Sequence, residues 1–307
     1  MSEINILMAT YNGEKYISEQ IDSIINQTYN NWELLIRDDN STDKTKNIIK
    51  NYAKRDERIR VLEDDLGNVG VAKNFEILLK QSNLDYIMFS DQDDVWMKNK
   101  IEILFERIKK CEAKYSDEIP LLVHSDSYIT DEHLYVVEDN FIGEKGMNKG
   151  LNNIIFSPLV QGSSMMINSN LKRYILPFPK NINIHDHYIS IVNEIVGKRL
   201  YINKPLMYYR QHSSNEIGVN KNYLNKLKKV LKSDFELTTK KTRKMMDFIY
   251  NNFHEKLTNK QKKIIKAFFL ITNSNYRFKK AYYILKYKFK TKDGILALII
   301  KVLLKNK

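Results

Sequence analysis

The sequence contains a single cysteine, Cys111, in 307 residues. An intramolecular disulfide framework is therefore excluded, and the composition is typical of a protein from a reducing compartment. Long apolar runs are also missing. Ile4–Ala9 is too short for a secretory signal and lacks a basic leader. Ile295–Leu304 is interrupted by Lys301 and is far shorter than the ~20 apolar residues that span a bilayer. We therefore expect neither a cleaved leader nor a transmembrane helix.

Glycine-rich phosphate-binding loops are absent as well. The chain has 10 glycines, yet no GxGxxG follows its first apolar run and it contains no GxxxxGK[ST]. These absences exclude the common dinucleotide and P-loop patterns. If a nucleotide binds, we expect side chains and a metal ion to hold it rather than a glycine-rich helix start.

Acidic residues are scarce at the C-terminal end. Residues 219–307 carry 24 Lys and Arg against 5 Asp and Glu, whereas residues 1–218 carry 26 against 32. The first part of the chain is thus slightly acidic, and a strongly basic region follows it. This asymmetry predicts an anionic partner at the C-terminal end, either a membrane surface or a polyanion.

Short apolar runs alternate with helical patterns in the first third of the chain. The runs, which are typical of buried strands, occupy 4–9, 32–37, 59–63 and 86–89. The helical patterns between them occupy 14–27, 44–53 and 71–80. This alternation predicts an α/β fold with a parallel sheet.

Later in the chain the pattern becomes less regular and then changes. Further strands are expected at 121–124, 165–167, 200–202 and 206–209, with a helix at 188–196 and an irregular or helical insert at 131–153. After about residue 218 the alternation stops. Basic helices are expected at 221–234, 236–255, 260–271 and 276–290.

Polar clusters follow each of the first four predicted strands. They are Thr10–Asn12, Asp38–Asp39, Gly67–Gly70 and Asp91–Asp94. Ligands bind beyond the carboxyl ends of strands in such sheets, so these clusters predict one site. The carboxylates of the last cluster repel one another unless a cation neutralises them, which suits a hard divalent ion that also holds phosphate. The alternative is a solvated acidic turn before the next helix.

Seven motifs occur in an order that resembles a known family. They are ATYNGEKYI, RDDNSTDKT, GNVGVAKNF, SDQDDVW, QGSSMMINSNL, HDHYISIV and YRQHSSNEIGV. Together they resemble the inverting GT-A glycosyltransferases of family 2, within the rhamnosyltransferase-like branch of bacterial capsule and O-antigen synthesis. The resemblance covers residues 4–218. It implies a GT-A catalytic domain at 1–218, with a nucleotide-sugar half at about 1–100, an acceptor half at about 101–218, and a basic helical region at 219–307.

The resemblance implies roles for residues of the nucleotide-sugar half. Asp38 would accept a hydrogen bond from a pyrimidine imide N–H, which selects uracil or thymine over cytosine, and Asp91 would contact the ribose. Lys73 stands where many relatives have arginine, so the charge is kept but the bidentate fork is lost. The implied donor-binding set is Thr10, Tyr11, Glu14, Asp38, Asn68, Lys73, Asp91 and Gln92.

The resemblance also implies a metal site and a catalytic base. Asp93 would bind Mn²⁺ or Mg²⁺, with His212 as a second contact to the metal or the diphosphate. Asp186 matches the general base, although HDH departs from the usual HDW. Helix capping by Asp186 and a structural role for His212 are the alternatives. The residues assigned to acceptor or sugar are Trp96, His185 and Arg210, and Trp96 equally fits the core.

The function implied is inverting sugar transfer to a saccharide hydroxyl on a lipid-linked acceptor, in surface polysaccharide synthesis. The preferred donor is dTDP-rhamnose, and a UDP-hexose or UDP-N-acetylhexosamine is the alternative. We expect peripheral contact of the basic region with the inner face of a bacterial plasma membrane, and no nucleic acid partner. Homo-oligomerisation is left open. Nucleotidyl transfer and polyanion binding are the competing functions from other classes.

Overall fold

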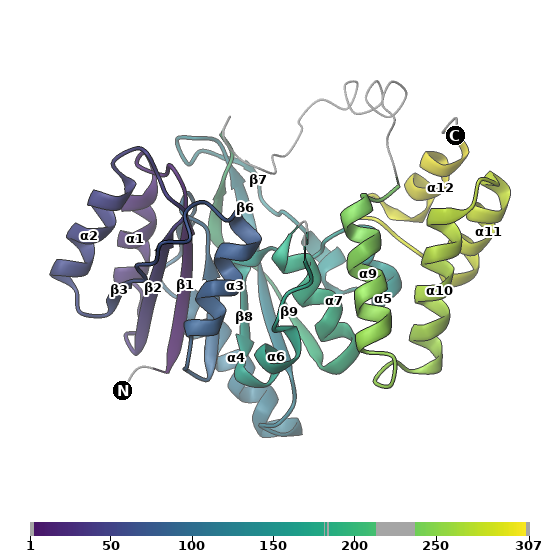
Figure 1. The fold of residues 1–307 in the computed structure, drawn as a ribbon, viewed down its shortest axis with the longest axis horizontal. Helices are drawn as coiled ribbons and strands as arrows, with labels where there is room; N and C mark the ends of the chain where they lie inside the picture. The colour runs from purple at the N-terminus through teal and green to yellow at the C-terminus, as the bar shows by residue number, and fades with distance from the viewer. Residues whose placement is uncertain (1–2, 181, 183, 213–236, 305–307) are drawn as a thin grey trace.

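The computed structural model describes residues 3–180, 182, 184–212 and 237–304. The helix expected at 221–234 and the second half of the YRQHSSNEIGV motif lie outside the described residues. Within them, strands and helices form one mixed α/β body followed by a group of C-terminal helices (Figure 1). This arrangement confirms the predicted fold class.

The described strands form a nine-stranded sheet in the order β3-β2-β1-β4-β8-β6-β9-β5, with β7 paired to β6. The first four strands of the chain pair with one another in parallel, as the alternation predicted. These strands are β1 (Ile4–Thr10), β2 (Trp32–Asp38), β3 (Ile59–Val61) and β4 (Tyr86–Ser90). Their carboxyl ends therefore meet at one edge, where the polar clusters follow.

The second half of the sheet is mixed in direction. Strand β8 is antiparallel to both β4 and β6, whereas β6 and β9 are parallel to each other. The short β5 pairs antiparallel with the end of β9, which brings the acidic loop back to the sheet. The bounds are β5 (Val95–Trp96), β6 (Leu121–Thr130), β7 (Val136–Glu138), β8 (Met165–Asn168) and β9 (Lys198–Arg210).

Two sequence expectations for this half were wrong. Strand β6 does not end at the Ser125–Ser127 cluster but continues through it to Thr130. Asp126 can stay buried inside the strand because its carboxylate accepts hydrogen bonds from the backbone N–H groups of Phe141 and Gly143. The two strands expected at 200–202 and 206–209 are one long strand, β9, whose register against β6 shifts beside Asp126.

Helices cover both faces of the sheet. Along β1, Ile4, Ile6 and Met8 point into one core and Leu7 into the other, as the two-residue period of a strand requires. The first core packs against α1 and α4, and the second against α3 and α7. The bounds are α1 (Ile17–Ile25), α2 (Thr45–Arg55), α3 (Val71–Gln81), α4 (Lys100–Tyr115), α5 (Leu151–Ile154), α6 (Ser169–Ile175) and α7 (His185–Val196), with 3₁₀ turns η1 (Gly143–Met147) and η2 (Gly162–Ser164).

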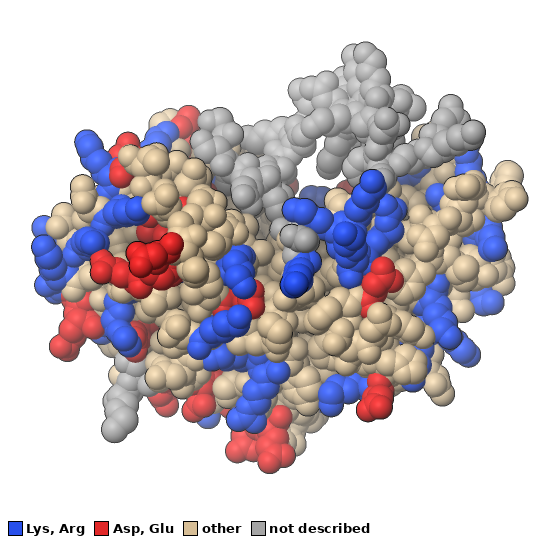
Figure 2. All heavy atoms as spheres, viewed as in Figure 1, with Lys and Arg blue, Asp and Glu red and all other residues tan. Residues whose placement is uncertain are grey.

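The C-terminal helices extend the second core instead of forming a separate one. Phe268 contacts Phe156 with ring centroids 5.3 Å apart, and Gln261 donates to the backbone oxygen of Glu194 on α7. Figure 2 shows Lys and Arg side chains spread over this end of the molecule. None of the described helices is both long and apolar enough to cross a bilayer. The bounds are α9 (Lys240–Asn252), α10 (Asn259–Asn273), α11 (Arg277–Tyr287) and α12 (Gly294–Leu304).

Candidate active site

A cleft of about 730 Å³ opens at the carboxyl ends of β1, β2 and β4 and extends to the start of α7. Nine of the fourteen residues assigned from the sequence line it: Thr10, Tyr11, Asn68, Asp91, Gln92, Asp93, His185, Asp186 and His212. Five others do not: Glu14, Asp38, Lys73, Trp96 and Arg210. The structure thus gathers residues 202 positions apart, from Thr10 to His212, into one concave site.

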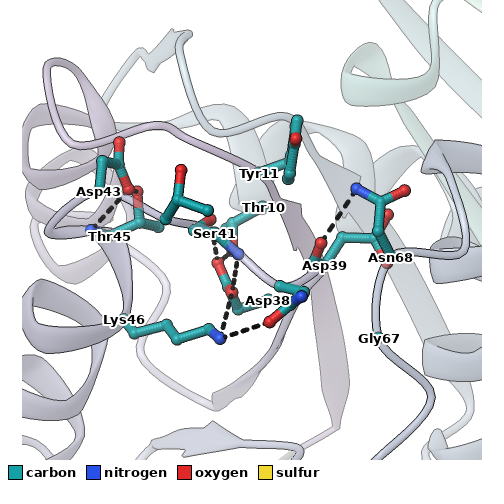
Figure 3. A network of polar contacts seen from close by, with 12 residues as sticks. Thr10, Tyr11, Asp38, Asp39, Ser41, Asp43, Thr45, Lys46, Gly67 and Asn68 are labelled. Carbon is teal, nitrogen blue, oxygen red and sulfur yellow. Dashed lines mark hydrogen bonds and ion pairs between the residues drawn. The ribbon is translucent and has the colours of Figure 1, made fainter.

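Asp38 organises the turn after β2. Its carboxylate accepts hydrogen bonds from the Thr10 hydroxyl (2.9 Å) and from the backbone N–H of Ser41 (2.7 Å). Lys46 lies 3.9 Å from the same carboxylate. Figure 3 shows Asp38 turned toward Ser41 and Lys46. These contacts give Asp38 a role in shaping the loop that leads into the cleft.

The neighbouring Asp39 lines the cleft and was missed in the sequence. It is 3% exposed, and its carboxylate accepts from the backbone N–H groups of Val69 and Gly70, both at 2.8 Å, and from Arg37 at 2.9 Å. Asn68 donates to the Asp39 backbone oxygen at 3.1 Å (Figure 3). The sequence signal that could have identified Asp39 is its position as the second aspartate of the RDDNS motif. Local pattern could not say which of the two adjacent aspartates faces the ligand.

Tyr11 and Gln92 join the ends of β1 and β4. The backbone N–H of Tyr11 donates to the Gln92 side-chain oxygen, and the Gln92 amide donates back to the Tyr11 carbonyl, both at 2.8 Å. A Cβ at Gly13 would lie 2.3 Å from the Gln92 oxygen, so a larger residue there would displace the Gln92 side chain. Tyr11 itself is 49% exposed, which leaves its ring free at the mouth of the cleft.

Three of the residues outside the lining make local contacts. Glu14 accepts from the backbone N–H of Lys44 at the start of α2, and Lys73 forms an ion pair with Glu76 at 2.8 Å. Trp96 is buried in the core on the α4 side of the sheet. Of the two roles left open for Trp96, this placement fits the core, because the residue is only 3% exposed.

Arg210 supports the acidic loop from β9 without lining the cleft. Its guanidinium donates to the backbone oxygens of Asp93 (2.9 Å) and Glu132 (2.6 Å) and forms an ion pair with Glu19. It also lies over the ring of Tyr16, 4.5 Å from the centroid. Arg210 is thus placed to fix the backbone of Asp93, and it is nearly fully buried.

The acidic loop carries more negative charge than its surroundings balance. Asp94 is fully buried, and within the described structure neither of its carboxylate oxygens has a hydrogen-bond partner. Burial and repulsion from Asp93 and Asp91 raise the pKa of Asp94 well above its usual range, and the nearby Ser163 side chain offsets only part of this rise. Burial and the charges of Asp93 and Asp186 raise the pKa of Asp91 to about 7.

Lys100 is the buried cation behind this loop, and the sequence did not single it out. Its ammonium donates to the Ser163 backbone oxygen at 2.5 Å and lies 3.6 Å from the Trp96 ring centroid. Loss of hydration lowers the pKa of Lys100 well below its usual value, and the charges of Asp94 and Asp91 offset only part of this. One ammonium faces several carboxylates, so the loop favours a further cation.

The residues present fit a divalent cation that is shared with a bound ligand. Asp93 Oδ2 lies 2.8 Å from His212 Nε2, and Tyr16 packs on the His212 ring at 4.8 Å. Among the described residues no group of three His, Cys, Asp or Glu is arranged to hold a metal ion. Hard cations need six or more oxygen-type ligands, so an ion at Asp93 and His212 would take the rest from phosphate oxygens and water.

Asp186 lies in the first turn of α7 with one oxygen engaged and one free. Oδ2 accepts from the backbone N–H of Gly162 at 3.0 Å, while the buried Oδ1 has no partner in the described structure. Burial raises the pKa of Asp186 to about 7. The N-cap residue of α7 is Ile184, so Asp186 does not occupy the capping position. A carboxylate with these properties can take up a proton near neutral pH.

His185 forms the floor beside this carboxylate. It packs between Phe75 (4.2 Å between centroids) and Phe89 (5.5 Å), and burial lowers its pKa to about 3, which keeps the ring neutral. Neither ring nitrogen has a partner in the described structure, nor has the side-chain amide nitrogen of the cleft residue Gln161. Buried polar groups are rarely left unpaired, so these atoms point to a polar ligand.

His187, the last residue of HDH, contacts the backbone instead of the cleft. Its Nε2 lies 2.8 Å from the backbone oxygen of Ile154, which ties α7 to α5. The HDH motif therefore places its three side chains in two environments. His185 and Asp186 line the cleft, and His187 faces the core behind it.

Known glycosyltransferases are similar to this chain in sequence. A family profile described as "Glycosyl transferase family 2" matches residues 5–155. The chain is 31% identical over 231 residues to dTDP-rhamnosyl transferase RfbG of Shigella flexneri, which covers 73% of this chain and 78% of that protein. It is 37% identical over 107 residues to the UDP-Glc:alpha-D-GlcNAc-diphosphoundecaprenol beta-1,3-glucosyltransferase WfgD of Escherichia coli, over 35% of this chain and 41% of that protein.

Two solved structures have a similar fold over nearly the whole chain. TarS of S. aureus, solved with UDP-GlcNAc, matches with a TM-score of 0.56 at 17% identity and covers 99% of this chain and 91% of that one. The mannosyltransferase PcManGT of Pyrobaculum calidifontis, solved with GDP-Man and Mn²⁺, gives 0.55 at 11% identity, covering 99% and 86%. At these identities the likeness concerns the fold alone, which is GT-A.

Proposed function

The chain belongs to glycosyl transferase family 2, and from this premise we propose an inverting transfer of a sugar from a nucleoside-diphosphate donor to an acceptor hydroxyl. The observation that carries the proposal is the pairing of two functions in one cleft. The unpartnered Oδ1 of Asp186 and the carboxylates of Asp91 and Asp93 belong to residues that line the same cleft. A base and a diphosphate site are what a single displacement requires.

In the proposed step, Asp186 Oδ1 accepts the proton of the acceptor hydroxyl. The acceptor oxygen then forms a bond to the anomeric carbon as the bond from that carbon to the diphosphate oxygen breaks. The electron pair leaves with the nucleoside diphosphate, and one displacement inverts the configuration. The Gly162 N–H donates to Oδ2 at 3.0 Å. This hydrogen bond leaves Oδ1 as the oxygen that takes the proton.

For the donor, we propose that Asp39 and Tyr11 receive the base and that Asp91 receives the ribose. The role first assigned to Asp38 passes to Asp39, because Asp39 lines the cleft and Asp38 does not. An acceptor carboxylate at the base selects an imide N–H, which uracil and thymine carry and cytosine lacks.

Asp93 and His212 would hold the divalent cation, Mn²⁺ or Mg²⁺. When bound, such an ion neutralises negative charge that develops on the departing diphosphate. Arg210 contributes by fixing the backbone of Asp93, and Tyr16 by packing against the His212 ring. The structure solved with GDP-Man and Mn²⁺ supports the use of a divalent metal by this fold.

For the sugar, we propose L-rhamnose from dTDP-rhamnose, supported by the 31% identity to a protein named as a dTDP-rhamnosyl transferase. A UDP-hexose or UDP-N-acetylhexosamine is the second candidate, supported by the neighbour solved with UDP-GlcNAc. His185 and Gln161 would bind sugar hydroxyls through their unpartnered polar atoms.

For the acceptor, we propose a lipid-linked saccharide in bacterial surface polysaccharide synthesis, at the inner face of the plasma membrane. The relative whose name includes a diphosphoundecaprenol acceptor supports this choice, although the match covers 41% of that protein. The basic C-terminal region adds a route to an anionic membrane.

A thermal-shift comparison of dTDP, UDP and CDP with Mn²⁺ tests the assignment of Asp39. A ligand that binds only the folded state raises the melting temperature, so dTDP or UDP should stabilise the wild type more than CDP does. Asp39→Asn should remove this preference, whereas Asp139→Asn, at an exposed position, should keep it. Equal stabilisation by all three nucleotides would show that Asp39 does not read the base.

A further inference from the structure

Exposed apolar side chains are concentrated on the last two described helices. Of the sixteen large apolar side chains that are exposed among the described residues, eight lie between positions 276 and 304. They are Tyr276, Phe278, Tyr282, Leu285, Leu296, Ile300, Leu303 and Leu304. Phe278 is 85% exposed and Leu296 is 71% exposed. Such a concentration on a folded protein marks a surface that binds something.

The spacing of these side chains places them on one face of each helix. Phe278, Tyr282 and Leu285 follow one another at intervals of four and three residues along α11. On α12 the same intervals separate Leu296, Ile300 and Leu303. Both helices hold their place in the fold through other residues, since Ile284 of α11 and Leu298 and Val302 of α12 are buried in the core. The exposed faces are therefore not needed for packing.

The two helices form an antiparallel pair. Arg277, at the start of α11, donates to the backbone oxygen of Leu303 near the end of α12 at 3.1 Å. The helices contact each other, and Figure 1 shows them together at one end of the molecule. Because they run in opposite directions, Phe278 lies level with the end of α12, and Leu285 lies level with its start. We call this pair, residues 277–304, the C-terminal hairpin.

Cations accompany the apolar side chains. The C-terminal hairpin contains eight Lys and Arg and one acidic residue, Asp293. Lys279 and Lys286 lie on α11 next to the face formed by Phe278, Tyr282 and Leu285, at positions one residue from its members. Long Lys stems lie along apolar surface and carry their ammonium groups outward. The combination is an apolar face bordered by positive charge.

A groove continues this surface toward α10. It has a volume of about 650 Å³, and its apolar lining is supplied by Phe269, Leu270 and Tyr276. Lys266 and Lys279 also line it. An apolar groove that carries two lysines fits a chain with an anionic head, as an acyl or isoprenoid phosphate would present.

We propose that the C-terminal hairpin is a membrane-binding surface, with its apolar face in the headgroup region of an anionic bilayer and its cations on lipid phosphates. The proposal rests on the proposed function in one respect, because a lipid-linked acceptor would then be held where the enzyme sits. Helices with such faces lie in the plane of the interface. At 11 residues each, α11 and α12 are too short to span a bilayer.

Charge and chemistry favour lipid over two other occupants. A second copy of the C-terminal hairpin would bring two surfaces of net charge +7 together, which is unfavourable at physiological salt. RNA would satisfy the cations, and its bases could stack on Phe278 and Tyr282. Aliphatic side chains such as Leu296 and Ile300 offer no stacking face, so RNA would leave half of the surface unused. A bilayer interface matches both parts.

Flotation of the full chain with lipid vesicles tests the proposal, using phosphatidylcholine alone and phosphatidylcholine with 30% phosphatidylglycerol. The wild type should bind the anionic vesicles and bind the neutral ones at least tenfold less. Phe278→Ser with Leu296→Ser and Ile300→Ser should weaken binding to anionic vesicles by roughly tenfold or more. Lys279→Gln with Lys286→Gln should weaken it by roughly tenfold and reduce its salt dependence.

A matched control replaces exposed apolar residues elsewhere, Tyr135→Ser with Met147→Ser, which are 72% and 57% exposed in the wild type. This variant should bind as the wild type does. All changed positions are exposed, so folding is checked by unchanged circular dichroism and melting temperature. Release of nucleoside diphosphate in solution should be the same in every variant, which separates failure of this proposal from failure of the proposed function.

Three outcomes would overturn the proposal. Equal vesicle binding by the wild type and the three-residue apolar variant would show that the face does not enter the bilayer. RNA binding in a filter assay that is tighter than vesicle binding, and is lost only in the lysine variant, would assign the surface to a polyanion. Self-association without lipid that disappears in the apolar variant would assign it to a second copy.

Discussion

At the scale of single residues, burial decides what each cleft carboxylate can do. Asp91 and Asp186 both have a pKa raised to about 7, but for different reasons. Asp186 is raised by burial alone and keeps one oxygen held by Gly162. Asp91 is raised by burial together with the charges of Asp93 and Asp186. A bound cation would relieve the repulsion at Asp91, whereas the environment of Asp186 leaves it suited to take up a proton.

Asp186→Asn should lower kcat by roughly 10²–10⁴-fold while donor binding changes little. Because a base acts only when it is deprotonated, kcat/KM of the wild type should rise up to about pH 7 and level off above it. The residual activity of Asp186→Asn should lack this rise. Initial rates between pH 5.5 and 8.5, measured alongside Asp139→Asn as an exposed control, check both points. An unchanged profile in Asp186→Asn would remove the base assignment.

Lys100→Met should lower the free energy of unfolding by about 1–3 kcal/mol at pH 7, because the buried Ser163 carbonyl loses its donor and the acidic loop loses the nearby amino group. Asp94→Asn in the same chain should recover part of this loss, since the uncompensated carboxylate is then gone. Lys110→Met is the control on the same helix. Its ion pair with Glu106 is exposed and is expected to contribute less than about 1 kcal/mol.

Urea denaturation of the wild type and the three variants gives these differences. If Lys100→Met and Lys110→Met cost the same, Lys100 would not be balancing the acidic loop. If Asp94→Asn recovered nothing, the effect of Lys100 would come from its packing against Trp96.

At the scale of elements, the turn η2 connects the base to the rest of the cleft. Gly162 donates its N–H to Asp186, and a Cβ at this position would lie 2.8 Å from His185 Nε2. The next residue, Ser163, receives the hydrogen bond from Lys100. One short turn thus lies between the acidic loop and the base, and its glycine allows the close approach.

Gly162→Ala should lower kcat by tenfold or more, because either His185 or the backbone donor to Asp186 must move. In a His185→Ala background the same change should cost clearly less, since the ring that meets the new Cβ is gone. Kinetics of the two single variants and the double variant give the coupling between the positions. Additive effects of the two changes would mean that the predicted clash does not govern the activity.

The elements also show what sequence could and could not provide. The first four strands could be predicted from short apolar runs that end in polar clusters. Strands that are buried on both faces are apolar throughout, so the sequence marks them directly. Strand β6 was cut short at Asp126, since a buried carboxylate inside a strand is stabilised by backbone donors from residues 141–143, which are distant in sequence. Tertiary partners of this kind leave no local signal.

The same reason explains the site residues. Thr10, Asp93 and Asp186 could be assigned to the cleft from the sequence. Thr10 and Asp93 follow predicted strands, and Asp186 lies in a motif whose place in the motif order resembles the family. Asp39 was passed over for Asp38, since two adjacent carboxylates at a strand end differ only in which contacts the fold gives them. Trp96 could not be separated from the core by sequence, and the pairing of β5 with β9 is what buries it.

At the scale of the whole molecule, an acidic-to-neutral catalytic body and a basic helical region share one core. The family profile ends at residue 155, whereas Asp186 and His212 lie beyond it and the whole described fold matches solved GT-A structures. The proposed base, the proposed donor site and the C-terminal hairpin are therefore parts of one architecture. The account requires that this architecture bind a nucleotide sugar with a metal ion at Asp93.

The most direct test of that claim is release of nucleoside diphosphate by the purified protein from dTDP-rhamnose, UDP-glucose, UDP-galactose and UDP-N-acetylglucosamine, with Mn²⁺, with Mg²⁺ and with a chelator. The account predicts turnover of one donor, with dTDP-rhamnose preferred, that needs the metal and is lost in Asp93→Asn. Turnover that survives both the chelator and Asp93→Asn would contradict the metal assignment. Absence of binding and turnover with every donor, in a protein shown to be folded, would contradict the proposed function itself.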